Sequence, residues 1–138
     1  MRAAVLAAGL LIAAGAAVAA DAPARDAGEA RYSPAYERCM TSPDGQSTLG
    51  MIDCASAETR VQDAALNRAY QKAMKGLNGR QKAKLQAAQR AWLAFRDAEC
   101  ASFEDEDWGT LSRINAADCF FHMTAMRVID LENYPPAT

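Results

Sequence analysis

Apolar residues recur at helical spacing over much of the chain, and nowhere do they alternate with polar residues as in a strand. From about residue 52 they return every three or four positions, which places them on one face of a helix. That face comprises Leu66, Tyr70, Ala73 and Leu77, widened by Val61, Ala65 and Ala69. We expect this helix to end at residues 77–79, with Gly79 in the left-handed conformation that commonly follows a helix.

A second helix is predicted directly after this turn. Neither Pro nor Gly interrupts residues 80–103. One face of this helix comprises Leu85, Ala88, Trp92 and Phe95. Each of the two helices has about 24 residues, or roughly 36 Å at 1.5 Å per residue. Because the turn between them is so short, they must run antiparallel.

A third helix is predicted after a polar loop. We expect Asn115 or Asp118 to cap its first turn, and we expect the helix to end before Pro135. Its apolar face would carry Phe120, Met123, Met126, Ile129 and Leu131. The predicted fold class is therefore all-α, a long antiparallel helical hairpin plus a third packing helix.

The chain begins with a separate apolar segment, residues 1–20. Arg2 precedes a run of Ala, Leu, Val and Ile that ends in small residues, which is the layout of a secretory signal peptide. A membrane anchor is the alternative, but the small-x-small sites within residues 17–20 favour cleavage. We therefore expect a periplasmic or secreted mature protein that begins near Asp21 or Ala20 and keeps no membrane span. This segment also explains the high apolar content of 51%, since the remaining composition is ordinary for a soluble domain.

Two further segments separate the signal peptide from the first helix. Residues 21–35 show no apolar period, and we expect them to form a flexible leader. The sequence Ser42-Pro43-Asp44-Gly45 predicts a turn, so residues 36–49 should form a loop. The helical domain is accordingly placed at residues 36–134.

Four cysteines follow the signal peptide: Cys39, Cys54, Cys100 and Cys119. An even number in a short exported chain indicates two disulfides. The hairpin brings all four to one end, so geometry allows each of the three pairings. We favour Cys39–Cys54 with Cys100–Cys119, because each closes a short loop and contributes about 3 kcal/mol on the chain-entropy model. Zinc is disfavoured because there is no C-x-x-C pair and a single histidine, His122, in an apolar stretch.

Three strings of residues look like a family signature. They read Asp63-x-x-Leu66-Asn67-x-x-Tyr70, then Gln89-Arg90-Ala91-Trp92-Leu93-x-Phe95-Arg96-Asp97-x-Glu99-Cys100, then Cys119 with Thr124-x-x-Arg127-x-x-x-Leu131. Between about Cys39 and Leu131 the chain resembles the LprI-type lysozyme inhibitors, a family of exported bacterial proteins. The resemblance implies an envelope or periplasmic protein that binds and blocks lysozyme-type muramidases.

The hairpin register gives these residues a structural role. With a turn near Asn78, Asp63 faces Arg96 or Arg90 across the seam, and Asn67 can accept a hydrogen bond from the same guanidinium. Trp92 and Tyr70 are aromatic side chains with one polar atom, which suits a half-buried seam. The full set of structural signature residues is Asp63, Leu66, Asn67, Tyr70, Gln89, Trp92, Arg96, Thr124 and Arg127.

Charge is unevenly distributed, although the net charge of the whole chain is only −2. Residues 54–100 hold nine basic and four acidic side chains, whereas residues 101–118 hold five acidic side chains and one arginine. The candidate partner-binding residues are Glu104, Asp105, Glu106, Asp107 and Trp108. An acidic loop ending in an aromatic ring suits a basic partner that has a cleft, as lysozymes do. The alternative is an ordinary solvated loop.

The sequence offers no catalytic site, no metal site and no cofactor motif. It lacks a Ser/His/Asp set, EF-hand spacing and a Gly-rich phosphate loop. Nucleic acid is disfavoured as a partner by the acidic balance and by export. The leading hypothesis is an exported, non-enzymatic protein that blocks a muramidase sterically. The alternatives are an envelope structural or stress protein that binds through its basic hairpin, and an immunity protein against a cell-wall-degrading toxin. The sequence leaves the oligomeric state open.

Overall fold

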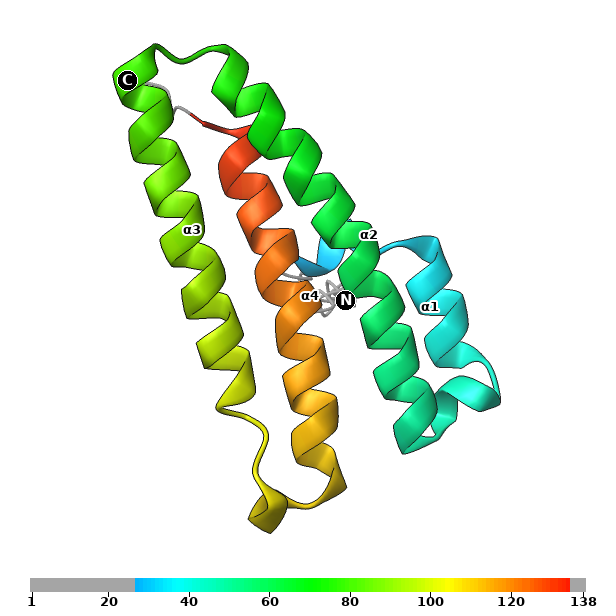
Figure 1. Ribbon diagram of the computed structural model, residues 1–138. Coiled ribbons are helices and arrows are strands. Elements are labelled where there is room, and N and C mark those ends of the chain that lie inside the picture. Colours follow the sequence, from blue (N-terminus) through cyan, green and yellow to red (C-terminus); the bar gives the residue numbers. More distant parts are fainter. Residues whose placement is uncertain (1–26, 135–138) are drawn as a thin grey trace, which may run out of the picture.

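The computed structural model describes residues 27–134, and this part of the chain is all-α (Figure 1). Its helices are α1 (Pro34–Thr41), α2 (Thr48–Lys75), α3 (Gly79–Ala101) and α4 (Thr110–Glu132). Short 3-10 turns lie at Glu29–Arg31, Asp44–Gln46 and Glu106–Trp108. The predicted fold class is confirmed. The predicted signal peptide and the first residues of the leader lie outside the described residues.

The helix boundaries differ from prediction where side chains cap the helices. Helix α2 begins at Thr48 because the Ser47 hydroxyl accepts a hydrogen bond from the Gly50 backbone N–H at 3.0 Å. The prediction that Gly79 ends this helix is wrong. Helix α2 ends at Lys75, and Gly79 is the first residue of α3. Asn78 and Gln81 form a capping box there, and its two hydrogen bonds start α3 immediately after the turn.

The start of the last helix is also earlier than expected. Neither Asn115 nor Asp118 is its cap, because α4 begins at Thr110 directly after Gly109. Gly109 has φ of 69°, and it is the only one of residues 27–134 with positive φ. A glycine adopts this conformation without the steric cost that a Cβ imposes. The chain therefore turns sharply into α4 at Gly109, directly after the acidic loop of residues 104–108.

Helix α4 lies between α2 and α3, which diverge from their shared turn (Figure 1). The predicted hairpin is present, but α2 packs mainly against α4 and only weakly against α3. Small residues line this α2–α4 interface, where Ala55, Ala69, Ala116 and Ala125 are all buried. Small side chains let two helices approach closely, so this pair forms the centre of the fold.

The core is concentrated toward the end of the molecule that carries the α2–α3 turn. Its buried cluster comprises Leu66, Ala69, Ala73 and Leu77 of α2 with Leu85 of α3 and Val128 and Leu131 of α4. Most of the predicted α2 face is therefore confirmed, whereas Val61 is 44% exposed. Burial of these side chains removes apolar area from water and is the main favourable term in folding.

The predicted apolar faces of α3 and α4 were partly wrong. Of the predicted α4 face, Leu131 is the one position that is buried, and the buried positions of α4 are Ser112, Ala116, Phe121, Thr124, Ala125, Val128 and Leu131. On α3, Ala88 and Phe95 are exposed, and Gln89 is buried instead. Helix α3 thus packs through a largely polar face.

The end of the predicted leader is not flexible. Ser33 caps α1, and both its backbone N–H and its hydroxyl donate to the buried Glu58 carboxylate, at 3.0 and 2.5 Å. Gln62 donates to the same carboxylate at 2.6 Å. Arg31 forms an ion pair with Glu132 at 2.8 Å. Residues 28–33 therefore pack against α2 and α4, and α1 occupies much of the region that was expected to be a loop.

Two disulfides link the helices at the end opposite the α2–α3 turn. Cys39–Cys54 joins α1 to α2, and Cys100–Cys119 joins the end of α3 to α4. The favoured pairing is confirmed. Within residues 27–134, no helix is long and apolar enough to cross a membrane.

The connection between α1 and α2 predicts a specific sensitivity to substitution. A Cβ at Gly50 would overlap the backbone carbonyl of Asp44, whereas a Cβ at Gly79 would meet no atom within 4 Å. We expect Gly50→Ala to destabilise the protein by about 1–3 kcal/mol, because the backbone must move. Gly79→Ala should leave the melting temperature unchanged or slightly raised. Thermal unfolding followed by circular dichroism measures both, and equal melting temperatures for the two variants would contradict this account.

Candidate functional site

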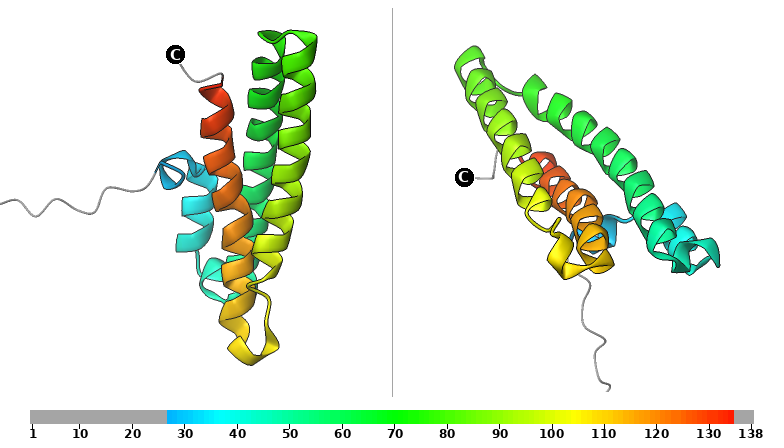
Figure 2. Two further views of the ribbon diagram at one scale, coloured as in Figure 1. Left: turned by 90° about the vertical axis from the view of Figure 1, so that its left-hand side faces the viewer. Right: turned by 60° about the horizontal axis from the view of Figure 1, so that its bottom comes forward.

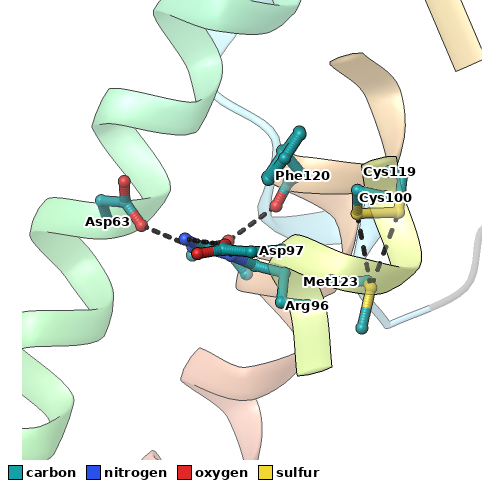
Figure 3. A network of polar contacts seen from close by, with 8 residues as sticks. Asp63, Arg96, Asp97, Cys100, Cys119, Phe120 and Met123 are labelled. Atoms are coloured by element: carbon teal, nitrogen blue, oxygen red, sulfur yellow. Dashed lines mark hydrogen bonds and ion pairs between the residues drawn. A yellow bond between two sulfur atoms is a disulfide. The ribbon is translucent and has the colours of Figure 1, made fainter. Parts of the chain in front are cut away.

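The signature arginine, Arg96, joins three helices (Figure 3). Its side chain is 11% exposed, and its Nη1 donates to Asp63 of α2 at 3.1 Å and to Thr124 of α4 at 3.0 Å. Its Nη2 donates to Asp97 at 2.9 Å. The expected Asp63–Arg96 pair is therefore present, and the guanidinium uses its several donors to connect separate elements.

Aromatic rings surround this guanidinium. Arg96 lies 5.4 Å from the ring centre of Trp92 and 5.6 Å from that of Phe120, which is cation–π distance. The Arg127 guanidinium of α4 lies 5.8 Å from the centre of the same Trp92 ring, and its Nε donates to the Gln89 side chain at 3.1 Å. Most of the signature side chains thus form the polar interface between α3 and α4.

Three signature residues of α2, Leu66, Asn67 and Tyr70, lie away from this α3–α4 interface, and Leu66 belongs to the buried core cluster. Asn67 is exposed and makes no hydrogen bond to Arg96 or Arg90, so its expected pairing with a guanidinium is absent. Tyr70 packs against the core cluster. Asn67 and Tyr70 both lie beside an open cleft of about 440 Å³ between α2 and α3, where these helices diverge.

The acidic loop projects from the end of the molecule that is opposite the α2–α3 turn (Figure 2). Residues 104–108 are all exposed, and Trp108 and Leu111 keep 61% and 60% of their surface in water. The Asp105 carboxylate accepts a hydrogen bond from the Asp107 backbone N–H at 2.8 Å, which fixes the turn. The Cys100–Cys119 disulfide closes the base of the loop. Two apolar side chains are therefore displayed among four carboxylates on a constrained projection.

A second feature, the aromatic groove, was not predicted. It is an open groove of about 580 Å³ between the N-terminal segment, α1, the end of α3 and α4. Its lining includes Tyr32, Tyr36 and Phe121, whose ring centres lie 4.8–5.5 Å apart. The Tyr32 hydroxyl shares a hydrogen bond of 2.7 Å with Nδ1 of His122. His122 therefore helps to hold the N-terminal segment on α4.

Carboxylates border this aromatic groove. Asp118, Glu99 and Glu29 all line it. Asp118 is half-buried and makes no hydrogen bond or ion pair with the described residues, and burial raises its pKa above 3.8. Burial also raises the pKa of Tyr36 to about 12, with contributions from the charges of Asp118 and Glu58. The groove thus combines aromatic rings with negative charge, the chemistry that binds cations.

The groove was missed because its tyrosines lie in or beside the segment that was expected to be flexible. A signal was present in the sequence, since Ser33-Pro34 is a typical helix start and Tyr32 and Tyr36 are four residues apart. Within residues 27–134, no cluster of three or more His, Cys, Asp or Glu side chains is arranged to hold a metal ion.

Comparisons with known proteins agree with the residue pattern. The family model described as "Lysozyme inhibitor LprI" matches residues 39–131. An uncharacterized protein of Rhizobium meliloti (strain 1021) is 27% identical, and the match covers 65% of this chain and 77% of that one. No solved structure matches the chain significantly.

The Arg96 contacts predict that Asp63 stabilises the fold. We expect Asp63→Ala to lower the free energy of unfolding by about 1 kcal/mol, because the substitution removes a charge-assisted hydrogen bond from a mostly buried guanidinium. Asn67→Ala, one helical turn away and exposed, should have almost no effect. Urea denaturation measures both. A destabilisation by Asn67→Ala equal to that by Asp63→Ala would show that the loss is not specific to this pair.

The raised pKa of Asp118 predicts a pH-dependent effect on stability. The folded protein binds a proton at the Asp118 carboxyl more tightly than the unfolded chain does. The contribution of Asp118 to the free energy of unfolding therefore falls as pH rises from 3.8 through the raised pKa. Asp118→Asn removes that loss, so its melting temperature should exceed that of the unmodified protein at pH 7. The difference should disappear below pH 3.8. Asp53→Asn, an exposed change on α2, is the matched control. A lower melting temperature for Asp118→Asn at pH 7 would contradict this reading.

Proposed function

Since the chain belongs to the lysozyme inhibitor LprI family, we propose that it is an exported protein that binds a lysozyme-type muramidase and blocks its substrate cleft. In this proposal the loop at residues 104–108 enters the cleft, and the protein acts by binding and not by catalysis. The observation that carries the proposal is the exposure of Trp108 and Leu111 on a projection surrounded by four carboxylates.

The shape of the loop supports insertion into a cleft. It lies at one end of an elongated helical molecule, so a partner reaches it without contact with the helix flanks (Figure 2). The disulfide at its base and the Asp105 hydrogen bond limit its motion before binding. A constrained loop loses less conformational entropy on binding than a flexible one, which favours affinity. Trp108 supplies the large aromatic surface that is common among residues dominating binding energy.

The charge distribution supports a basic partner. Residues 101–118 carry a net charge of −4 at the loop end, whereas residues 54–100 carry a net charge of +5. A basic enzyme is therefore attracted to the loop end and repelled from the α2–α3 turn. Such complementarity raises the association rate and orients the encounter.

The disulfides support export. Disulfides persist in oxidising compartments such as the periplasm and the extracellular space. Cys100–Cys119 closes the base of the proposed binding loop, so an oxidising compartment keeps this loop constrained.

Inhibition assays test the function directly. The purified, oxidised protein is titrated into c-type, g-type and bacterial muramidases while lysis of a peptidoglycan suspension is followed. We expect near-stoichiometric inhibition of at least one of these enzymes. Absence of inhibition with all three classes would reject the proposal and favour an envelope structural protein.

Substitution of Trp108 tests the role of the loop. Trp108→Ala should weaken inhibition by about tenfold or more, because the variant loses the aromatic ring that enters the cleft. Phe95→Ala, which removes an exposed aromatic ring from the flank of α3, is the matched control and should inhibit normally. The dose dependence of inhibition measures both variants. Equal inhibition by the two variants would show that the loop is not the inhibitory element.

Removal of charge from the loop tests whether its carboxylates raise the rate of association with a basic partner. The triple variant Glu104→Gln, Glu106→Gln and Asp107→Asn keeps Asp105, whose carboxylate fixes the turn. We expect it to associate more slowly with a basic muramidase and to lose most of the salt dependence of the association rate. Stopped-flow measurements at several salt concentrations measure this, and an unchanged salt dependence would refute electrostatic steering by the loop.

A further inference from the structure

We propose that the aromatic groove is a second contact site, one that receives an arginine or lysine side chain of the protein partner. The identity of that partner as a muramidase rests on the proposed function, whereas the preference of the groove for a cationic side chain rests on its own residues. The groove and the acidic loop are separate surfaces of the same molecule.

The groove has the size and the lining for such a side chain. At about 580 Å³ it is within the range of ligand pockets and is open to solvent. Phe121 lines the groove and is 2% exposed, and the half-buried rings of Tyr32 and Tyr36 pack against it. Aromatic rings attract a guanidinium or an ammonium through their quadrupole, and this attraction strengthens as water is excluded.

Asp118 supplies the specific polar contact. It is a half-buried carboxylate without a hydrogen bond or ion pair to the described residues, and it lines the groove together with Tyr36, on which its charge acts. An ionised carboxylate that has lost part of its hydration gains more from an incoming cation than a fully exposed carboxylate does. Glu99 lines the same groove and adds a second carboxylate from α3.

The position of the groove relates it to the acidic loop. Phe103 lines the groove and lies directly before Glu104, the first residue of that loop. Asn115 of α4, which follows the loop, lines the groove as well. One partner can therefore place its cleft over the loop and a basic side chain from the rim of that cleft in the groove. Two linked contacts increase both affinity and orientational specificity.

The first test measures binding to a c-type lysozyme. Asp118→Asn removes the charge and keeps the shape of the side chain, and Asp53→Asn makes the same change on an exposed part of α2 outside the groove. We expect Asp118→Asn to weaken the complex by about tenfold, and Asp53→Asn by less than about twofold. Calorimetric titration measures both after melting curves have shown that each variant is folded. Equal affinities of the two variants for the lysozyme would overturn the groove proposal. That result would not count against the proposed inhibitory function.

The second test needs no lysozyme. Nα-acetyl-arginine amide is titrated into isotopically labelled protein, with Nα-acetyl-citrulline amide as the uncharged probe of the same shape. We expect the arginine probe alone to shift the backbone resonances of Tyr36, Phe103 and Asp118, and we expect Asp118→Asn to abolish those shifts. Equal shifts from both probes, or none from either, would overturn the proposal. Shifts from the arginine probe without lysozyme binding would support the groove and reject the proposed function.

Discussion

The buried guanidinium of Arg96 is the contact on which the placement of α3 depends. Helix α3 has few buried apolar side chains, chiefly Leu85 near its start, so the hydrophobic effect alone fixes it weakly. Arg96 compensates by bonding to Asp63 and Thr124, which lie on two other helices. Its geometry is demanding, because a planar fork satisfies several acceptors only when those acceptors hold a fixed arrangement. The interaction therefore specifies where α3 lies relative to α2 and α4.

Both candidate binding surfaces depend on that placement. One turn after Arg96, the Cys100–Cys119 disulfide joins α3 to α4, and the acidic loop begins within four residues of Cys100. The Met123 sulfur lies 3.6 Å from both disulfide sulfurs and fills the space beside them (Figure 3). Glu99 and Phe103 form the α3 side of the aromatic groove. A shift of α3 would therefore move the loop and open one wall of the groove together.

Local patterns in the sequence indicated much of this fold, and the failures have identifiable causes. Helix periodicity, loop length and cysteine spacing predicted the long helices and both disulfides, because each reflects a local constraint. The Asp63–Arg96 pair followed from the register of the hairpin. The face of α4 was misjudged because close packing against α2 selects small residues such as Ala125, which carry little periodic signal. The aromatic groove was missed because the segment that forms it is ordered by tertiary contacts, among them those of Ser33 with Glu58 and of Tyr32 with His122.

Stability and binding are concentrated at opposite ends of the molecule. The apolar cluster lies toward the α2–α3 turn, whereas the interior toward the other end includes Glu58, Gln62 and Ser112. The polar side chains in the interior reduce what hydrophobic burial contributes at this end, and both disulfides lie there. The cross-links let this end expose Trp108 and keep Asp118 without an ion pair to any of residues 27–134, features that add nothing to folding. The fold thus places its covalent constraints where its surface is least favourable for stability and most suited to a partner.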